Sequence, residues 1–324
     1  MTIVPEKING YAELPDDSII KVLAYFDIFH YPLSKDEIKQ FLDKPVNDAM
    51  LDQALWRLQY AKSIFRINDF YSLRDEFLLA EKRTQGNLRA ERLLPKAMKI
   101  GRFLFRFPYV RAIGISGSLS KRHADENADI DFFVITKANR LWIARTLMHL
   151  FKKFTFLAGK QHFYCMNYYL DEAALQVEAK NIYTAIEIKT LLPVCGGETM
   201  EKFFLANKWA NEFLPNCMYK LLSKKRPPGS WFKRSAEWMF NNKPGDHLDN
   251  FLMGITTRRW KRKEKTGKRN KKGLTMGLVT GKHYAWSNPE SFQEKILFLY
   301  DQKLTELKLQ HIRWPEMVSL SFEE

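Results

Sequence analysis

The stretch that decides the fold runs from Gly114 to Thr136 and reads GISGSLSKRHADENADIDFFVIT. A turn of small residues separates two apolar runs, and the second run carries Asp129 and Asp131, one residue apart. Alternate side chains of a strand project from the same face, so we expect the two carboxylates to lie side by side. Charged groups in a buried strand are costly unless something pairs with them, and this predicts a bound cation.

The residues around this acid pair favour phosphate and metal chemistry. Gly117 and Ser118 follow the first apolar run and are expected to open a helix, where backbone N–H groups bind phosphate. Lys121 and Arg122 follow within reach of such a phosphate. Paired carboxylates suit Mg²⁺, with Mn²⁺ as an alternative, and Mg²⁺ also takes phosphate oxygens. A phosphate cradle beside a metal-binding acid pair predicts phosphoryl-group transfer.

The spacing of Gly117-Ser118 and the Asp129-x-Asp131 pair resembles the signature of the DNA polymerase β-like nucleotidyltransferase superfamily. The resemblance covers about residues 105–195 and implies a mixed sheet with helices. It also implies that the serine contacts an NTP, that both aspartates bind Mg²⁺, and that a nucleoside monophosphate passes to an acceptor hydroxyl. One of the two cations that follow the serine would neutralise the leaving pyrophosphate. The acceptor stays open between a small molecule, an RNA end and a protein side chain.

Enzymes of this superfamily usually place a third carboxylate on a later strand, and the sequence offers several positions for it. In the expected strand QHFYCMNYYL the available residue is Asn167, a neutral and weaker metal ligand, while Asp171 and Glu172 stand at the strand's end. Glu187, in the expected helix NIYTAIEIKTLLPV, is another candidate as metal ligand or base. The predicted catalytic set is therefore the acid pair with Glu187.

The whole chain is expected to be a multidomain α+β or α/β protein. Its predicted units are an irregular leader (1–15), a winged-helix-like domain (16–75), a helical bridge (76–104), the nucleotidyltransferase domain (105–195) and a mostly helical C-terminal region (196–324). The second of these resembles a winged helix-turn-helix by its order of three short helices and a hairpin. Its third helix has no excess of cations, so we expect this domain to pack or contact protein rather than nucleic acid.

Local signals support the winged-helix-like unit. Ser34 and Glu37 have the spacing of a capping box at the start of the second helix, and Asn47 is suited to cap the third. Asn68-Asp69 stands between two short β-like runs, which predicts a hairpin.

The chain is strongly basic, with 324 residues, 52 Lys and Arg against 37 Asp and Glu, and a formal net charge of +15. Such an excess favours contact with polyanions. Residues 258–272 contain ten Lys and Arg and one acid. This run could bind nucleic acid or a phosphorylated acceptor, or it could be a solvated segment. The alternative function is accordingly a nucleic-acid-binding regulator whose weak or inactive nucleotidyltransferase domain senses a nucleotide.

Other signals argue against export and membrane insertion. The three cysteines are scattered and form no CxxC pair, so free thiols are expected. The first residues lack the basic region and apolar core of a signal peptide, and no stretch reaches the roughly 20 apolar residues needed to span a bilayer. We expect a cytoplasmic protein without a membrane partner. The sequence leaves the NTP, the acceptor and the oligomeric state open.

Overall fold

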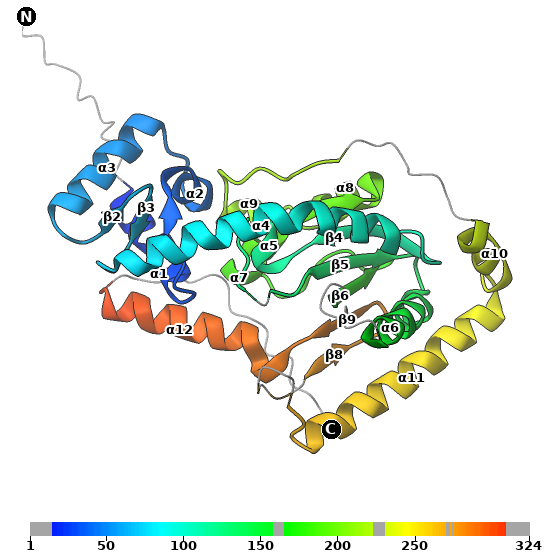
Figure 1. Cartoon of the computed structure of the whole chain (residues 1–324). Coiled ribbons are helices and arrows are strands. Elements are labelled where there is room, and N and C mark those ends of the chain that lie inside the picture. Colours follow the sequence, from blue (N-terminus) through cyan, green and yellow to red (C-terminus); the bar gives the residue numbers. More distant parts are fainter. Residues whose placement is uncertain are drawn as a thin grey trace, which may run out of the picture.

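The computed structural model describes residues 15–126, 128–157, 165–222, 231–269, 273, 275 and 277–308. The chain has a mixed α+β architecture (Figure 1). The helices are α1 (Asp16–Asp27), α2 (Lys35–Phe41), α3 (Asp48–Tyr60), α4 (Phe77–Leu104), α5 (Gly117–Ser120), α6 (Leu141–Leu157), α7 (Ile182–Thr190), α8 (Gly197–Ala206), α9 (Ala210–Phe213), α10 (Trp231–Met239), α11 (Lys243–Lys265), the 3₁₀ helix η2 (Pro289–Ser291) and α12 (Phe292–Glu306). The strands are β1 (Leu33–Ser34), β2 (Phe65–Ile67), β3 (Phe70–Ser72), β4 (Val110–Ile115), β5 (Asp131–Thr136), β6 (Cys165–Asp171), β7 (Leu192–Cys195), β8 (Leu278–Thr280) and β9 (Tyr284–Ser287). Nearly all of the predicted leader lies outside the described residues.

The first six elements form a unit of three helices and a three-stranded antiparallel sheet in the order β1-β3-β2. The capping box is confirmed, because Ser34 Oγ accepts the Glu37 N–H at 3.3 Å and the Glu37 carboxylate accepts the Ser34 N–H at 2.9 Å. Asn47 accepts a backbone N–H from the first turn of α3. The hairpin is also confirmed, with Asn68 in its turn at φ +54°.

Helix α4 runs from the N-terminal unit to the central sheet (Figure 1). Near its start, the buried Arg83 donates a hydrogen bond to the Pro32 carbonyl oxygen at 3.2 Å and pairs with the Glu37 carboxylate at 2.5 Å. Near its end, Gly101 lies so close to the sheet that a Cβ there would be 2.8 Å from the Val194 side chain. The helical character predicted for residues 76–104 is confirmed, and one continuous helix connects the two parts.

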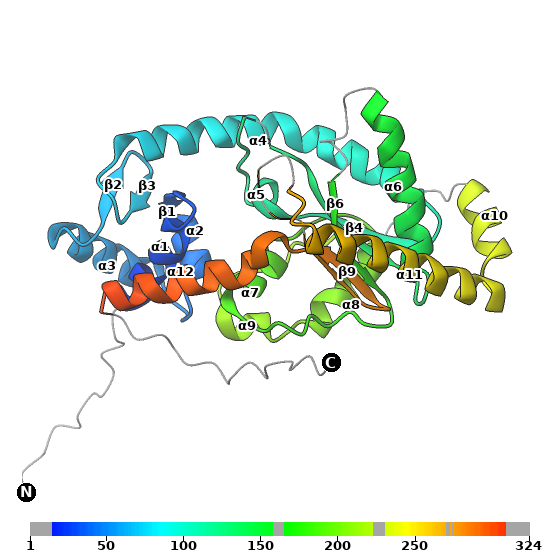
Figure 2. The same ribbon diagram turned by 90° about the horizontal axis from the view of Figure 1, so that it is seen from below.

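The central sheet has six strands in the order β7-β4-β5-β6-β9-β8. β5 and β6 are parallel, and the other neighbours are antiparallel. Side chains of β5 alternate between two cores, with Phe132 and Val134 in one and Phe133 and Ile135 in the other. Helices α4, α6 and α11 contribute to the first core, and α7, α8 and α9 contribute to the second. The sheet is therefore covered by helices on both faces (Figures 1 and 2).

Two features of the sheet differ from the sequence-based expectation. The helix expected through NIYTAIEIKTLLPV ends at Thr190, and Leu192–Cys195 instead forms the edge strand β7 beside β4. Pro193 explains the change, because proline cannot donate a helical hydrogen bond and is tolerated on an edge strand. In addition, β9 pairs with β6, and β8 pairs with β9. The sheet therefore includes two strands from beyond residue 195.

The last described helix packs back on the N-terminal unit, where α12 lies beside α1 in both views (Figures 1 and 2). The rings of Tyr25 and Tyr300 meet edge to face at 5.5 Å between centroids. Asp27 accepts hydrogen bonds from Lys303 on α12 and from Arg74, the latter at 2.7 Å. Among the described residues, no helix has both the length and the apolar character needed to cross a membrane.

Candidate functional site

The candidate site is built around the turn between β4 and α5. Gly117 has φ +68°, a left-handed conformation that favours glycine. A Cβ at this position would be 2.8 Å from Oδ2 of Asp131, so the backbone of the turn lies directly against this carboxylate. The Ser116 N–H donates to the Asp131 carbonyl oxygen at 3.0 Å, which extends the pairing of the two strands into the turn. Ser118 comes next, and it is exposed.

The two predicted acids lie at the start of β5 and are both partly buried. Asp131 is the first residue of the strand and pairs with Cys165 of β6, whereas Asp129 lies just before the strand. Burial raises the pKa of the Cys165 thiol to about 11, Lys152 opposes this shift, and the charges of Asp131 and Asp129 add to it. Both carboxylates therefore act on the same thiol, which is consistent with the predicted proximity of the pair.

Asn167 lies at an irregularity in the pairing of β5 with β6. The register changes between Met166 and Tyr168, so Asn167 has no partner of its own in β5. Such a bulge re-aims the side chain that it contains. Its Nδ2 donates to Oδ1 of Asp131 at 2.5 Å, and its Oδ1 accepts from the Cys165 thiol at 3.1 Å. In this arrangement Asn167 orients the aspartate that would bind metal and directs no oxygen toward such an ion.

Glu187 approaches the turn from α7 and is held by an ion pair. Its Oε1 lies 2.6 Å from Nζ of Lys121, and the same Nζ donates to the Gly117 carbonyl oxygen at 3.2 Å. Burial strongly raises the pKa of the Tyr183 phenol, and the charges of Glu187 and Asp131 raise it further. The structure thus brings Glu187, Lys121 and the turn together, and the charges of Glu187 and Asp131 both act on the Tyr183 phenol.

Sequence reasoning missed the residues that support the loop after α5. The Tyr31 hydroxyl, from the N-terminal unit, donates to the Lys121 carbonyl oxygen at 2.9 Å. The His123 ring lies against Gly86 of α4 so closely that a Cβ on Gly86 would be 2.1 Å from it. No local pattern marks these contacts, because Tyr31 and Gly86 are far from the loop in the sequence.

A second cation also lies near the predicted phosphate-binding residues. The Lys220 side chain is exposed, but partial desolvation lowers the pKa of its ammonium, and the charges of Arg122 and Lys121 lower it further. Lys220 therefore lies close enough to Arg122 and Lys121 for their charges to repel its own. Arg122 itself is exposed and has φ +59°. The cationic side of the site includes a residue from the segment after α9, which the sequence did not indicate.

The donor set fits a hard divalent cation only in part. Asp129 and Asp131 supply two carboxylates, which are suitable ligands for Mg²⁺. Within the described ranges, no group of three or more His, Cys, Asp or Glu side chains is placed to hold a metal. Mg²⁺ usually keeps several waters and takes phosphate oxygens, so two protein carboxylates with a bound triphosphate are compatible with it.

The first part of the basic run is helical, and most of its described residues are exposed to solvent. Residues 258–265 belong to α11, whereas residues 270–272 lie outside the described part of the chain. Nζ of Lys263 lies 4.4 Å from the centroid of the Trp260 ring, so a cation of the same helix already covers one face of this indole. The run presents cations along a helix, but Trp260 is a poor platform for a nucleic-acid base.

The exposed side of α3 carries no excess of positive charge. Asp48 and Asp52 are exposed there and pair with Lys39 and Lys35 of α2 at 2.7 and 2.5 Å. Arg57 is held by Asp16, at 2.8 Å from its Nε. That the N-terminal unit packs or contacts protein stays a prediction. Comparison with family models, curated proteins and solved structures found no match for this chain.

Proposed function

We propose that this chain is a cytoplasmic Mg²⁺-dependent nucleotidyltransferase that transfers a nucleoside monophosphate from an NTP to a hydroxyl acceptor. The observation that carries the proposal is the contact between the left-handed turn at Gly117 and the Asp131 carboxylate. A backbone suited to phosphate and an acid suited to metal lie against each other, as phosphoryl transfer requires. The mixed sheet and the order α1-β1-α2-α3-β2-β3 support a polymerase β-like central domain and a winged-helix N-terminal domain.

Each group in the site has a proposed role. Asp129 and Asp131 would hold Mg²⁺, and Asn167 would orient the second of these carboxylates. The bound ion would neutralise negative charge on the phosphates. The turn at Gly117 and the hydroxyl of Ser118 would bind the triphosphate, because Gly117 lies against Asp131 and the next residue, Ser118, is exposed.

The ion pair of Lys121 and Glu187 gives the site a means of responding to substrate. A triphosphate competes with Glu187 for the Lys121 ammonium, because phosphate oxygens are strong acceptors of charged hydrogen bonds. The freed Glu187 carboxylate would then accept the proton of the acceptor hydroxyl. The hydroxyl oxygen bonds to the α-phosphorus, the bond to the bridging oxygen breaks, and pyrophosphate leaves with Lys121 and Arg122 beside it.

The proposal is tested by nucleotide binding and pyrophosphate release with Asp131→Asn. We expect this variant to lose Mg²⁺-dependent binding of fluorescent ATP and of the other NTPs in competition. Asp125→Asn is a matched control, since its carboxylate lies in the same loop and is exposed. Incorporation of label from α-labelled NTPs into small-molecule, RNA and protein fractions would identify the acceptor. Undiminished Mg²⁺-dependent ATP binding by Asp131→Asn would refute the assignment.

The absence of a carboxylate at Asn167, where the superfamily usually has its third acid, favours a second function. Asn167 contributes an amide N–H to Asp131, and Glu187 is engaged by Lys121, so neither adds a carboxylate to Asp129 and Asp131 in the part of the chain that the structure describes. Such a site would bind an NTP without transferring it, and the chain would be a nucleic-acid-binding regulator that senses nucleotide. Nucleotide binding without pyrophosphate release, together with nucleic-acid binding that changes on addition of NTP, would favour this function over the enzyme.

A further inference from the structure

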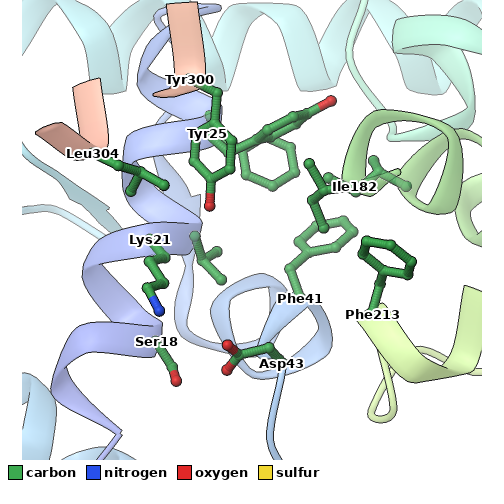
Figure 3. A pocket seen from close by; sticks show the side chains of 12 residues that line it. Ser18, Lys21, Tyr25, Phe41, Asp43, Ile182, Phe213, Tyr300 and Leu304 are labelled. Carbon is green, nitrogen blue, oxygen red and sulfur yellow. The ribbon is translucent and has the colours of Figure 1, made fainter. Parts of the chain in front are cut away.

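A cavity of about 60 Å³ lies where the N-terminal unit, α7, α9 and α12 meet (Figure 3). Its wall is mostly apolar and includes the buried side chains of Phe41, Ile186 and Leu304. A group the size of a water molecule needs about 10–15 Å³ of such space, so the cavity has room for roughly four to six groups of that size. That matches a branched aliphatic group of four carbon atoms better than a benzyl group of seven, with the polar ends of a ligand at the open side of the cavity.

Polar groups gather at one end of this cavity, where Figure 3 shows Ser18 and Lys21 of α1 and Asp43 of the loop after α2. The buried Oδ1 atom of Asp43 has no hydrogen-bond partner within the described part of the chain. No ion pair within 4.0 Å joins Asp43 to Lys21. Two opposite charges thus border the same apolar space without meeting, and a buried acceptor remains unsatisfied, which is unusual in a native fold.

We propose that this cavity is an effector site for a small α-amino acid with a branched aliphatic side chain. The ligand's ammonium group donates hydrogen bonds to Asp43, and its carboxylate accepts them from Lys21. The aliphatic side chain fills the space beside Phe41, Ile186 and Leu304. A zwitterion satisfies both charges at once, whereas a plain carboxylate or amine leaves one of them without a partner.

Helix α7 connects this cavity with the candidate active site. Ile182 and Ile186 line the cavity, and the next residue, Glu187, forms the ion pair with Lys121. Tyr25 also lines the cavity; burial raises the pKa of its phenol and the charge of Glu187 raises it further, so Glu187 lies near this ring. A ligand that orders this face of α7 will therefore change nucleotide affinity, a step that rests on the proposed function.

Calorimetric titration of the full chain tests the binding step with four probes: L-leucine, L-phenylalanine, 4-methylpentanoate and 3-methylbutylamine. We expect L-leucine to bind about tenfold or more tightly than 4-methylpentanoate and 3-methylbutylamine, because each of these lacks one charged group and each charged hydrogen bond that is lost accounts for about that factor. L-Phenylalanine keeps both charged groups, and we expect it to bind more weakly than leucine because its side chain is larger than the apolar space. Lys21→Gln and Asp43→Asn should each weaken leucine binding by a similar factor. Lys82→Gln, on the exposed side of α4, is the control and should have no effect.

Several outcomes would overturn the proposal. Equal affinities for leucine and its two deaminated or decarboxylated analogues would refute the zwitterion, and equal affinity for phenylalanine would refute the size of the cavity. The absence of leucine binding at millimolar concentration would refute the site itself. Fluorescent ATP with Mg²⁺ then tests the coupling, for which we expect a several-fold change in affinity when leucine is added. Leucine binding without such a change refutes the effector role, whereas failure of ATP to bind under both conditions counts against the nucleotidyltransferase and leaves the leucine result unaffected.

Discussion

Replacing Gly117 with alanine tests the turn on which the candidate site depends. Gly117 combines φ +68° with a Cβ position 2.8 Å from Oδ2 of Asp131. Two other glycines separate these effects. Gly267 has φ +60° but nothing within 4 Å of its Cβ position, and Gly254 lies inside α11 with neither a left-handed φ nor a close neighbour.

The three alanine variants should follow a definite order of stability. Gly254→Ala should raise the free energy of unfolding by roughly 0.5–1 kcal/mol, because alanine favours a helix interior. Gly267→Ala should lower it by about 1 kcal/mol, since left-handed strain of roughly 1–2 kcal/mol exceeds the entropic gain of about 0.4–1 kcal/mol. Gly117→Ala should lower it further, because the new methyl group must also displace the Asp131 carboxylate.

Denaturant unfolding measures the stabilities, and Mg²⁺-dependent binding of fluorescent ATP measures the site. We expect Gly117→Ala to weaken ATP binding about tenfold or more, since a displaced carboxylate misplaces the groups that hold the triphosphate. The two control variants should bind ATP as the parent does. If Gly117→Ala is as stable as Gly254→Ala, the left-handed conformation assigned to residue 117 is wrong. If it matches Gly267→Ala in stability and the parent in ATP affinity, the contact with Asp131 has no part in nucleotide binding.

Three further predictions concern other parts of the molecule. Burial raises the pKa of Asp249 to about 6, although backbone N–H groups oppose this, so the folded state holds its proton more tightly than the unfolded state. The resulting stability is complete below pH 4 and is lost as the pH rises through about 6. The isosteric Asp249→Asn should therefore be more stable than the parent above pH 7, by about 3 kcal/mol, and parallel pH–stability curves would contradict this. Asn167→Asp places a second carboxylate against that of Asp131, so the melting temperature of this variant should be lower than the parent's without Mg²⁺. Addition of Mg²⁺ should raise it by more than it raises the parent's, and an identical response to Mg²⁺ would exclude this position from the metal site. Replacing Lys261, Arg262 and Lys265 with serine should make the slope of log affinity for nucleic acid against log salt concentration less steep by roughly 2–3, at about 0.7–0.9 per phosphate contact. If the unmodified protein binds no nucleic acid at low salt, the regulator function is excluded.

Several features were predictable because they depend on neighbours in the chain. The capping box of Ser34 and Glu37 joins atoms three residues apart, and the turn at Asn68 lies between the two strands that it connects. The turn at Gly117 follows its strand directly. Periodicity and turn chemistry act over a few residues, so the order of these elements can be read from the sequence.

Other features could not be predicted because they depend on distant segments. The segment of β7 was expected as helix; Pro193 opposes helix locally, but only the pairing with β4 decides that the segment becomes an edge strand of this sheet. β8 and β9 join the sheet from more than 100 residues beyond β6, a pairing that short-range patterns do not encode. The bulge that directs Asn167 toward Asp131 arises from the register of two strands and not from its local sequence.

The sequence by itself determined which residues could carry charge and phosphate chemistry: the glycine turn and the aspartates two positions apart. Strand alternation and the steric freedom of glycine are local properties, so they belong to the chain before it folds. The tertiary structure alone decided that Glu187 pairs with Lys121, that Asn167 donates to Asp131, and that a cavity lies behind α7. These contacts join segments far apart in sequence, and they form only when the packing of helices on the sheet makes up for the entropy of closing the long loops between them.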